Sequence, residues 1–190
     1  MMHAQGRDAD LWVFGYGSLM WRPGFSFAEH QIATVRGYHR ALCVYSHVHR
    51  GTPDRPGLVL GLDSGGACKG MAFRVPAPMA EATIAYLRQR EQVTSVYREL
   101  LLPVRLVDGR RMIALCYAVD RHHAQYAGRL DKADLERLVR QGHGVSGANP
   151  DYICNTHAHL AQLGIRDTAL EWLVQRFAAE AADPEQALAG

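Results

Sequence analysis

Short apolar runs alternate with Gly and Pro over residues 11–119, and this punctuation favours strands with few helices between them. Asp108 and Gly109 separate the last two runs, and both residues tolerate the left-handed backbone of a tight hairpin turn. We therefore predict an α+β fold with a curled, mixed or antiparallel sheet of six to seven strands, or a small barrel, and flanking helices. Six strands are expected at Leu11–Gly15, Ile32–Tyr45, Gly57–Leu62, Lys69–Val75, Arg98–Val107 and Arg111–Val119.

Helices are predicted once within this series, at residues 78–91, and then through the rest of the chain. Asp131 is expected to cap a helix that ends at Gly142. Asn149 and Pro150 have the order of an N-cap and a first helical residue. Further along, a stripe of an amphipathic helix is formed by Leu170, Leu173, Val174 and Phe177. We expect one domain over residues 11–180, with terminal extensions at 1–10 and 181–190.

The composition of the chain argues against several classes of binding partner. The 190 residues carry a formal net charge of +2, so no nucleic acid or anionic membrane is demanded as a partner. No apolar stretch is long enough to span a bilayer, and residues 1–10 carry charges where a signal peptide would be apolar. We expect a soluble, cytoplasmic protein. Its four cysteines lack C-x-x-C spacing and its histidines lack a recognised ligand spacing, so no metal site is expected.

The first predicted strand runs into a turn that is bracketed by glycines, in the segment Leu11–Trp21. Gly15 and Gly17 permit positive φ and a close approach of the backbone to a small molecule. Consecutive amides in such a turn can cradle an anion. For a lone G-x-G, an ordinary tight turn after a strand is the favoured alternative.

Glu91 falls on or beside the buried face of the helix predicted at 78–91, because it lies four residues after Leu87 and seven after Ile84. Burial and the negative end of the helix dipole would both raise the pKa of its carboxyl group toward the range of a general base. Alternatively, Glu91 faces water and pairs with Arg88 or Arg90. The core stripe expected on this helix is Met79, Thr83, Tyr86 and Leu87.

A series of short segments, in order along the chain, resembles the motifs of one family. They are Tyr16–Trp21 (YGSLMW), Gly37–Arg40 (GYHR), Ser46 with His49–Pro53 (HRGTP), Lys69–Pro76 (KGMAFRVP), Arg90–Tyr97 (REQVTSVY) and Ser146–Tyr152 (SGANPDY). This ordered set resembles the ChaC family of γ-glutamylcyclotransferases that act on glutathione. The resemblance covers roughly Leu11 to Gly164.

The resemblance implies a γ-glutamylcyclotransferase-like fold and a lyase reaction that converts glutathione to 5-oxoproline and Cys-Gly. It implies Glu91 as the general acid and base, no metal and no cofactor. The turn from Tyr16 to Leu19 would hold either the substrate α-carboxylate or the developing oxyanion. The substrate-binding residues implied are Tyr16, Gly17, Ser18, Leu19, Arg40, Ser46, Arg50, Tyr97 and Tyr152, with His49 as a further candidate.

Other readings stay open at this point. A cyclotransferase for other γ-glutamyl amino acids or amines would use the same chemistry with a different leaving group. A non-catalytic module that binds a carboxylate-bearing metabolite would use the glycine turn alone. The chain also departs from the family where Glu91 is followed by residues 92–95 without a glycine, which bears on loop flexibility and glutathione preference. A monomer and a dimer are both compatible with the composition.

Overall fold

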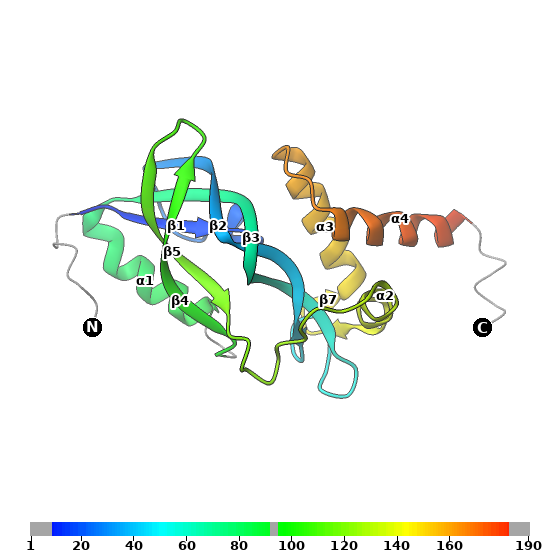
Figure 1. The fold of residues 1–190 in the computed structure, drawn as a ribbon. Coiled ribbons are helices and arrows are strands. Elements are labelled where there is room, and N and C mark those ends of the chain that lie inside the picture. Colours follow the sequence, from blue (N-terminus) through cyan, green and yellow to red (C-terminus); the bar gives the residue numbers. More distant parts are fainter. Residues whose placement is uncertain (1–8, 92–94, 183–190) are drawn as a thin grey trace. The chain divides into compact units, whose positions relative to one another are not determined.

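A computed structural model describes residues 9–91 and 95–182 (Figure 1). The chain forms two compact units. Unit 1 comprises Met1–Ala41 and Leu60–Tyr126, and unit 2 comprises Leu42–Val59 and Ala127–Gly190. The expectation of a single domain over residues 11–180 stays a prediction. Most of the two terminal extensions, 1–8 and 183–190, lies outside the described residues.

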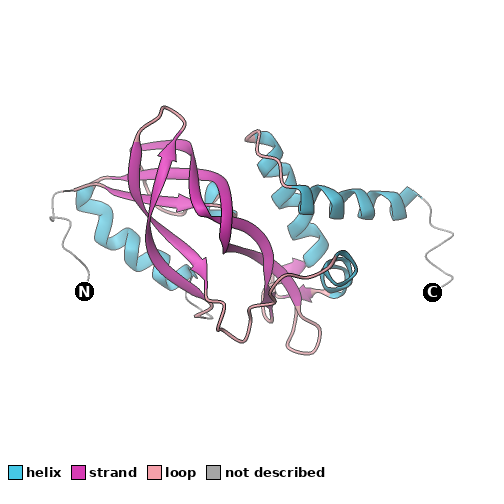
Figure 2. Ribbon diagram, viewed as in Figure 1, coloured by secondary structure: helices cyan, strands magenta, loops and turns pink. Residues whose placement is uncertain are grey.

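Five strands close into a barrel in the order β1-β3-β2-β4-β5 (Figure 2). β1 pairs antiparallel with β3 and parallel with β5, so the sheet is mixed, as predicted. β4 and β5 form a hairpin whose turn contains Gly109 at a φ of 95°, which confirms the predicted turn. The strands are β1 Leu11–Gly15, β2 Glu29–Ser46, β3 Gly57–Val75, β4 Tyr97–Leu106 and β5 Arg111–Val119.

The predicted strand count was too high for this barrel, because two expected strands are one. Residues 57–62 and 69–75 belong to the single strand β3, which continues through Ser64, Gly65 and Gly66. Gly65 and Gly66 have φ values of 104° and 72°, and a positive φ is easily reached by residues without a Cβ. The glycine pair therefore bends the backbone locally without ending the strand.

Helix α1 (Ala77–Glu91) is the only α-helix that the described residues place between strands of the barrel, as predicted. Its Leu87 is fully buried in a cluster with Val13, Leu115 and Tyr117. Thr83 is also buried, whereas Met79 is 39% exposed, so Met79 was wrongly assigned to the core stripe. Leu87 therefore packs α1 against β1 and β5.

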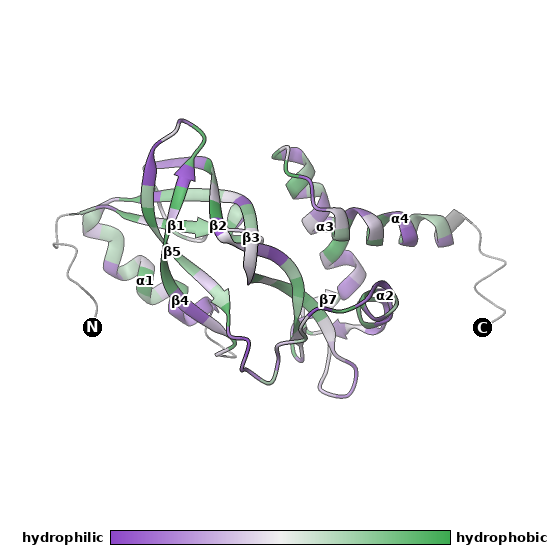
Figure 3. Cartoon of the chain, in the orientation of Figure 1, coloured by the Kyte–Doolittle hydropathy of each residue, from purple (hydrophilic) through white to green (hydrophobic). Residues whose placement is uncertain are grey.

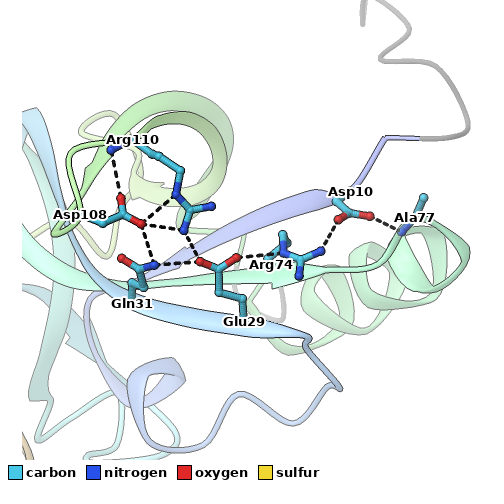
Figure 4. Close-up of polar contacts among 7 residues, drawn as sticks. All are labelled: Asp10, Glu29, Gln31, Arg74, Ala77, Asp108 and Arg110. Atoms are coloured by element: carbon cyan, nitrogen blue, oxygen red, sulfur yellow. Dashed lines mark hydrogen bonds and ion pairs between the residues drawn. The ribbon is translucent and has the colours of Figure 1, made fainter.

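Asp10 ties the start of β1 to the start of α1. One carboxylate oxygen of Asp10 accepts a hydrogen bond from the backbone N–H of Ala77 at 3.0 Å, and the other accepts from Arg74 Nη1 at 2.6 Å (Figure 4). The first N–H groups of a helix have no partner within it, so this carboxylate supplies one. Arg74 and Ala77 hold the pKa of Asp10 below its usual value.

A polar network continues from Arg74 across the barrel surface (Figure 4). Glu29, at the start of β2, accepts from Arg74 at 3.0 Å and forms an ion pair with Arg110. Asp108 pairs with Arg110 at 2.8 Å and accepts from Gln31 at 2.9 Å. The network therefore links the start of β2, the end of β3 and the β4–β5 turn.

Unit 2 contains three helices and a two-stranded sheet in the described residues. Asp131 caps α2 through a hydrogen bond from the backbone N–H of Asp134, as predicted. Leu170 and Leu173 of α4 are fully buried, and Gly164 follows α3 with a φ of 65°. These elements are α2 Lys132–Gln141, β6 His143–Gly144, β7 Gly147–Ala148, α3 Asn149–Gln162 and α4 Thr168–Ala182.

Asn149 does not cap α3, which corrects the prediction from its position before Pro150. The N-cap is Ala148, and Asn149 is fully buried inside the helix. Its side chain accepts from the backbone N–H of Leu58 at 2.7 Å and donates to the Leu58 carbonyl at 2.8 Å. Asn149 thus completes the hydrogen bonding of β3 rather than that of its own helix.

Among the described residues, no helix is both long enough and apolar enough to cross a membrane. The closed barrel with its helices confirms the α+β class.

Candidate active site

The glycine turn after β1 is built differently from the prediction. Neither Gly15 nor Gly17 has a positive φ, and the φ of Gly17 is −133°. The chain reverses instead through a short 3-10 helix, Ser18–Met20, in which the Met20 N–H donates to the Gly17 carbonyl at 2.9 Å. Gly15 is required for space, because a Cβ there would lie 2.9 Å from the Leu19 Cβ.

This turn leaves backbone donors available. In the part of the chain that the structure describes, the N–H groups of Gly17, Ser18 and Leu19 donate to no backbone acceptor. The first N–H groups of a helix commonly lack an internal partner and suit an anion. The Leu19 side chain is buried in the cluster under α1, which holds the turn against the barrel.

Arg40, from β2, holds the turn through a hydrogen bond to its backbone. Its Nε donates to the Tyr16 carbonyl at 2.6 Å, and its Nη2 donates to the Lys69 carbonyl at 2.7 Å. These bonds connect the turn to β2 and β3. Direct binding of substrate by Arg40 stays a prediction.

Glu91 is the last residue of α1, and its side chain is only 18% exposed. Burial raises the pKa of the Glu91 carboxyl, and the positive charge of Arg90 opposes this rise without cancelling it. Arg90 Nε lies 3.1 Å from Glu91 Oε1. The two alternatives for Glu91 therefore both hold in part, since it is largely buried and also paired with an arginine.

Arg90 connects Glu91 to the turn, a role that sequence reasoning missed. Its Nη2 donates to Ser18 Oγ at 2.9 Å, while its Nη1 donates to the Arg22 carbonyl at 2.6 Å and to Tyr86 Oη at 3.2 Å. Arg90 therefore contacts the candidate base and the candidate anion-binding turn with one guanidinium group. The adjacent positions in the sequence gave only a possible counter-charge for Glu91.

The hydrogen bonds around Tyr117, on β5, were also not predicted. Tyr117 Oη lies 3.3 Å from Glu99 Oε2, and Arg88 forms a paired hydrogen bond with Glu99 at 2.7 and 2.8 Å. Burial raises the pKa of the Tyr117 phenol far above its usual value, and the charges of Glu99 and Glu91 add to this rise. Tyr117 is therefore a neutral hydroxyl within the electrostatic reach of Glu91. Its position inside an apolar strand gave no signal of this role.

Tyr97 is held at the start of β4. Its hydroxyl donates to the Leu60 carbonyl at 2.8 Å, and its ring packs against the cluster that contains Leu87 and Tyr117. Unit 1 thus brings together Tyr16, Gly17, Ser18, Leu19, Arg40, Glu91 and Tyr97 of the predicted residues.

Unit 2 brings together the other predicted residues. Ser46 is buried, and its Oγ accepts from the backbone N–H of Arg50 at 2.9 Å. The Arg50 guanidinium stands over the Tyr152 ring at 5.4 Å from its centroid and donates to the Ala148 carbonyl at 3.1 Å. His49 Nδ1 lies 3.0 Å from Ser146 Oγ. Substrate binding by these residues stays a prediction.

Residues 9–91 and 95–182 bring together no group of three or more His, Cys, Asp or Glu side chains suited to a metal ion. Their four cysteines are free thiols, of which Cys43, Cys68 and Cys116 are buried and Cys154 is exposed. The expected absence of a metal and of a cofactor stays a prediction.

Solved structures include a similar fold. Most of the chain, 87%, superimposes with a TM-score of 0.78 on 96% of a crystallised γ-glutamyl cyclotransferase specific to glutathione from yeast. The sequence identity in this match is 21%, so the match concerns the fold.

Curated proteins of related sequence include two glutathione-specific γ-glutamylcyclotransferases. The Escherichia coli K12 protein is 34% identical over 88% of this chain and 72% of its own length. The protein numbered 1 from Homo sapiens is 31% identical over 78% of this chain and 68% of its own length.

A family model agrees with these relatives. The model described as ChaC-like protein matches residues 11–180, a range that contains the glycine turn, Glu91 and the Arg50–Tyr152 pair. The chain belongs to the ChaC-like family.

Proposed function

We propose that this chain is a γ-glutamylcyclotransferase that converts glutathione to 5-oxoproline and Cys-Gly. Membership of the ChaC-like family and the names of its relatives support the activity. The observation that carries the proposal is the bridge through Arg90, which joins the buried Glu91 carboxylate to the turn at Ser18. The bridge connects Glu91, the proposed proton acceptor, to a turn whose Gly17, Ser18 and Leu19 amides donate to no backbone acceptor among the described residues.

The first step forms a carbon–nitrogen bond within the substrate. The α-amine of the γ-glutamyl group is protonated near neutral pH, so it must lose a proton before it can attack its own γ-carbonyl carbon. The Glu91 carboxylate accepts this proton. Its raised pKa makes it a stronger base than an ordinary glutamate. Attack closes a five-membered ring and places a negative charge on the carbonyl oxygen.

The second step breaks the original amide bond. Glu91 returns the proton to the departing cysteinyl nitrogen and then takes the second proton from the ring nitrogen, which passes to the released amine. The oxyanion reforms a carbonyl, and 5-oxoproline and Cys-Gly separate. No water is consumed and no oxidation occurs. We propose that the amides of Gly17, Ser18 and Leu19 receive either the developing oxyanion or the α-carboxylate. Binding also holds the amine and the γ-carbonyl in a ring-closing pose. The activation barrier is lower because the substrate loses its orientational entropy on binding and not in the chemical step.

The remaining predicted residues are proposed to act in binding rather than in proton transfer. Tyr97 would line the pocket, and Ser46, Arg50 and Tyr152 would contact the glycine carboxylate or the cysteinyl backbone. Replacing Arg50 would then raise KM more than it lowers kcat. The small-molecule substrate without nucleic-acid or membrane partners, and the cytoplasmic location, are also predictions.

The decisive experiment incubates purified protein with millimolar glutathione and detects 5-oxoproline and Cys-Gly by mass spectrometry. Glu91→Gln should lower kcat by about 10²- to 10⁴-fold, the usual contribution of a general acid and base. Glu81→Gln is the matched control, since Glu81 is exposed on the same helix and should leave kcat unchanged.

Three outcomes would contradict parts of the proposal. Equal activity of the parent and Glu91→Gln would remove Glu91 from the chemistry. Inactivity of the parent on glutathione with activity on another γ-glutamyl amino acid would change the substrate and keep the reaction. Inactivity on every γ-glutamyl compound, with glutathione binding retained, would favour a binding module.

A further inference from the structure

A groove of about 570 Å³ lies along β2 and β4 on the surface of unit 1, and the proposed reaction does not use it. Its walls include Ile32, Thr34 and Arg36 from β2, and Pro103 and Arg105 from β4. Residues 33 and 35 of β2, between these side chains, are buried in the barrel. The groove is therefore on the outer face of the sheet. Lys69 of β3 and Arg111 of β5 complete its basic lining.

Strand register concentrates positive charge in this groove. Thr34 is opposite Arg105 in the pairing of β2 with β4, and Arg105 is opposite Arg111 in the pairing of β4 with β5. Two like charges directly opposite each other destabilise a sheet. An anion placed between Arg105 and Arg111 would remove this repulsion.

The protein itself supplies no such anion among the described residues. The side chains of Arg36, Lys69, Arg105 and Arg111 are exposed, and no described carboxylate forms an ion pair with any of them. Arg110 differs from its neighbour Arg111, because Arg110 pairs with both Glu29 and Asp108. Figure 3 shows the colour of hydrophilic residues on both strands of the β4–β5 hairpin.

The size and lining of the groove indicate the class of ligand. Its volume falls within the range of about 300–1,000 Å³ that is typical of small-molecule sites. Four cationic side chains match the charge of a triphosphate, and arginine forks bind phosphate oxygens in pairs. The described residues that line the groove include no aromatic ring on which a nucleobase could stack, so we expect recognition mainly of the phosphates.

We propose that this groove is a binding site for a small anion with two or more linked phosphate groups, held by Arg36, Lys69, Arg105 and Arg111. Inorganic polyphosphate and the phosphate chain of a nucleoside triphosphate share this chemistry. The site is independent of the proposed cyclotransferase reaction, because Glu91 and Ser18 lie in the region covered by α1 and bridged by Arg90.

Isothermal titration calorimetry of the full chain with tripolyphosphate, in about 150 mM salt, tests the site. We expect a Kd below about 1 mM for the parent. Arg36→Gln and Arg105→Gln, on different strands, should each weaken binding by about fivefold or more. Arg98→Gln is the matched control, because Arg98 is an exposed arginine of β4 outside the groove, and it should change Kd by less than about twofold.

Titrations with other anions distinguish a nucleoside triphosphate from inorganic polyphosphate and can contradict the proposal. ATP that binds at least as tightly as tripolyphosphate assigns the site to a nucleoside triphosphate, whereas weaker ATP binding assigns it to inorganic polyphosphate. Citrate that binds as tightly as tripolyphosphate would overturn the preference for phosphate. Absence of binding to the parent, or equal weakening by Arg98→Gln and Arg105→Gln, would overturn the site. The thermal midpoint of each variant shows that it is folded.

Discussion

The ionisation of Glu91 should be visible in the pH dependence of the reaction. Burial raises the pKa of Glu91, and only its deprotonated form accepts the substrate proton. We therefore expect kcat/KM to fall as the pH drops through a pKa above about 4.3, the ordinary value for glutamate. A pH–rate profile with glutathione measures this limb. A limb at or below the ordinary value would contradict the burial of the functional carboxylate.

Arg90 should influence the same limb. Its positive charge lowers the pKa of Glu91, so Arg90→Gln should move the acid limb of kcat/KM to higher pH. Loss of its hydrogen bond to Ser18 should also lower kcat/KM by about tenfold, the usual effect of one charge-assisted hydrogen bond. A role confined to folding would reduce the amount of active enzyme without moving the limb. Arg88→Gln provides the comparison on the same helix, since Arg88 pairs with Glu99 instead.

At the residue scale, the sequence predicts the burial of a side chain better than it predicts its partners. The position of Glu91 follows from the helical period that also buries Leu87, and the family resemblance adds its role. The contact between Arg90 and Ser18 joins residues that are 72 positions apart, so no local pattern reports it. Ser95 has a φ of 57°, a left-handed value that its residue type does not predict.

At the scale of elements, the connection between α3 and β3 should be a strong determinant of stability. Asn149→Ala should lower the free energy of unfolding by about 2–4 kcal/mol, because it leaves the backbone N–H and carbonyl of Leu58 unpaired in the interior. Asn155→Ala, on the exposed face of α3, should change it by less than about 0.5 kcal/mol. Urea unfolding measures both. Similar midpoints for the two variants would show that the Leu58 bonds contribute little.

Element boundaries were predictable where an apolar run is bounded by turn residues or a hairpin dipeptide is present. The limits of β1 and β5 match the prediction to the residue, since each is an apolar run bounded by turn residues. The separate strands predicted at residues 57–62 and 69–75 form the single strand β3, which continues through Gly65 and Gly66. The order of Asn149 and Pro150 predicts an N-cap, whereas the actual partner of the Asn149 side chain, Leu58, is 91 residues away.

At the scale of the whole molecule, the two compact units share strands, and this should make unfolding cooperative. β2 crosses from unit 1 to unit 2 at Ala41–Leu42, and β3 crosses at Val59–Leu60. Loss of order in one unit therefore removes the support of a strand in the other. We expect one unfolding transition in urea, with coincident loss of helical circular dichroism and tyrosine fluorescence signals.

Buried thiols supply local probes for this prediction. Cys116 belongs to unit 1 and Cys43 to unit 2, and both are buried. Pulsed alkylation followed by mass spectrometry should show both becoming reactive at the same urea concentration. Cys154 is an exposed residue and should react before unfolding. Its reaction should be slow at neutral pH, because partial burial of the thiol and the charge of Asp151 raise its pKa. Separate midpoints for Cys43 and Cys116 would show that the units unfold independently.

The basic groove concentrates positive charge on one face of the barrel, although the net charge of the whole chain is only +2. Four positive groups on neighbouring strands act as a local pole, so the field near that face is much stronger than a uniformly spread charge would produce. On a negatively charged chromatography resin the protein should adsorb by that face. It should therefore be retained even near its isoelectric point of about 8.4, where a protein of the same net charge without such a pole would elute.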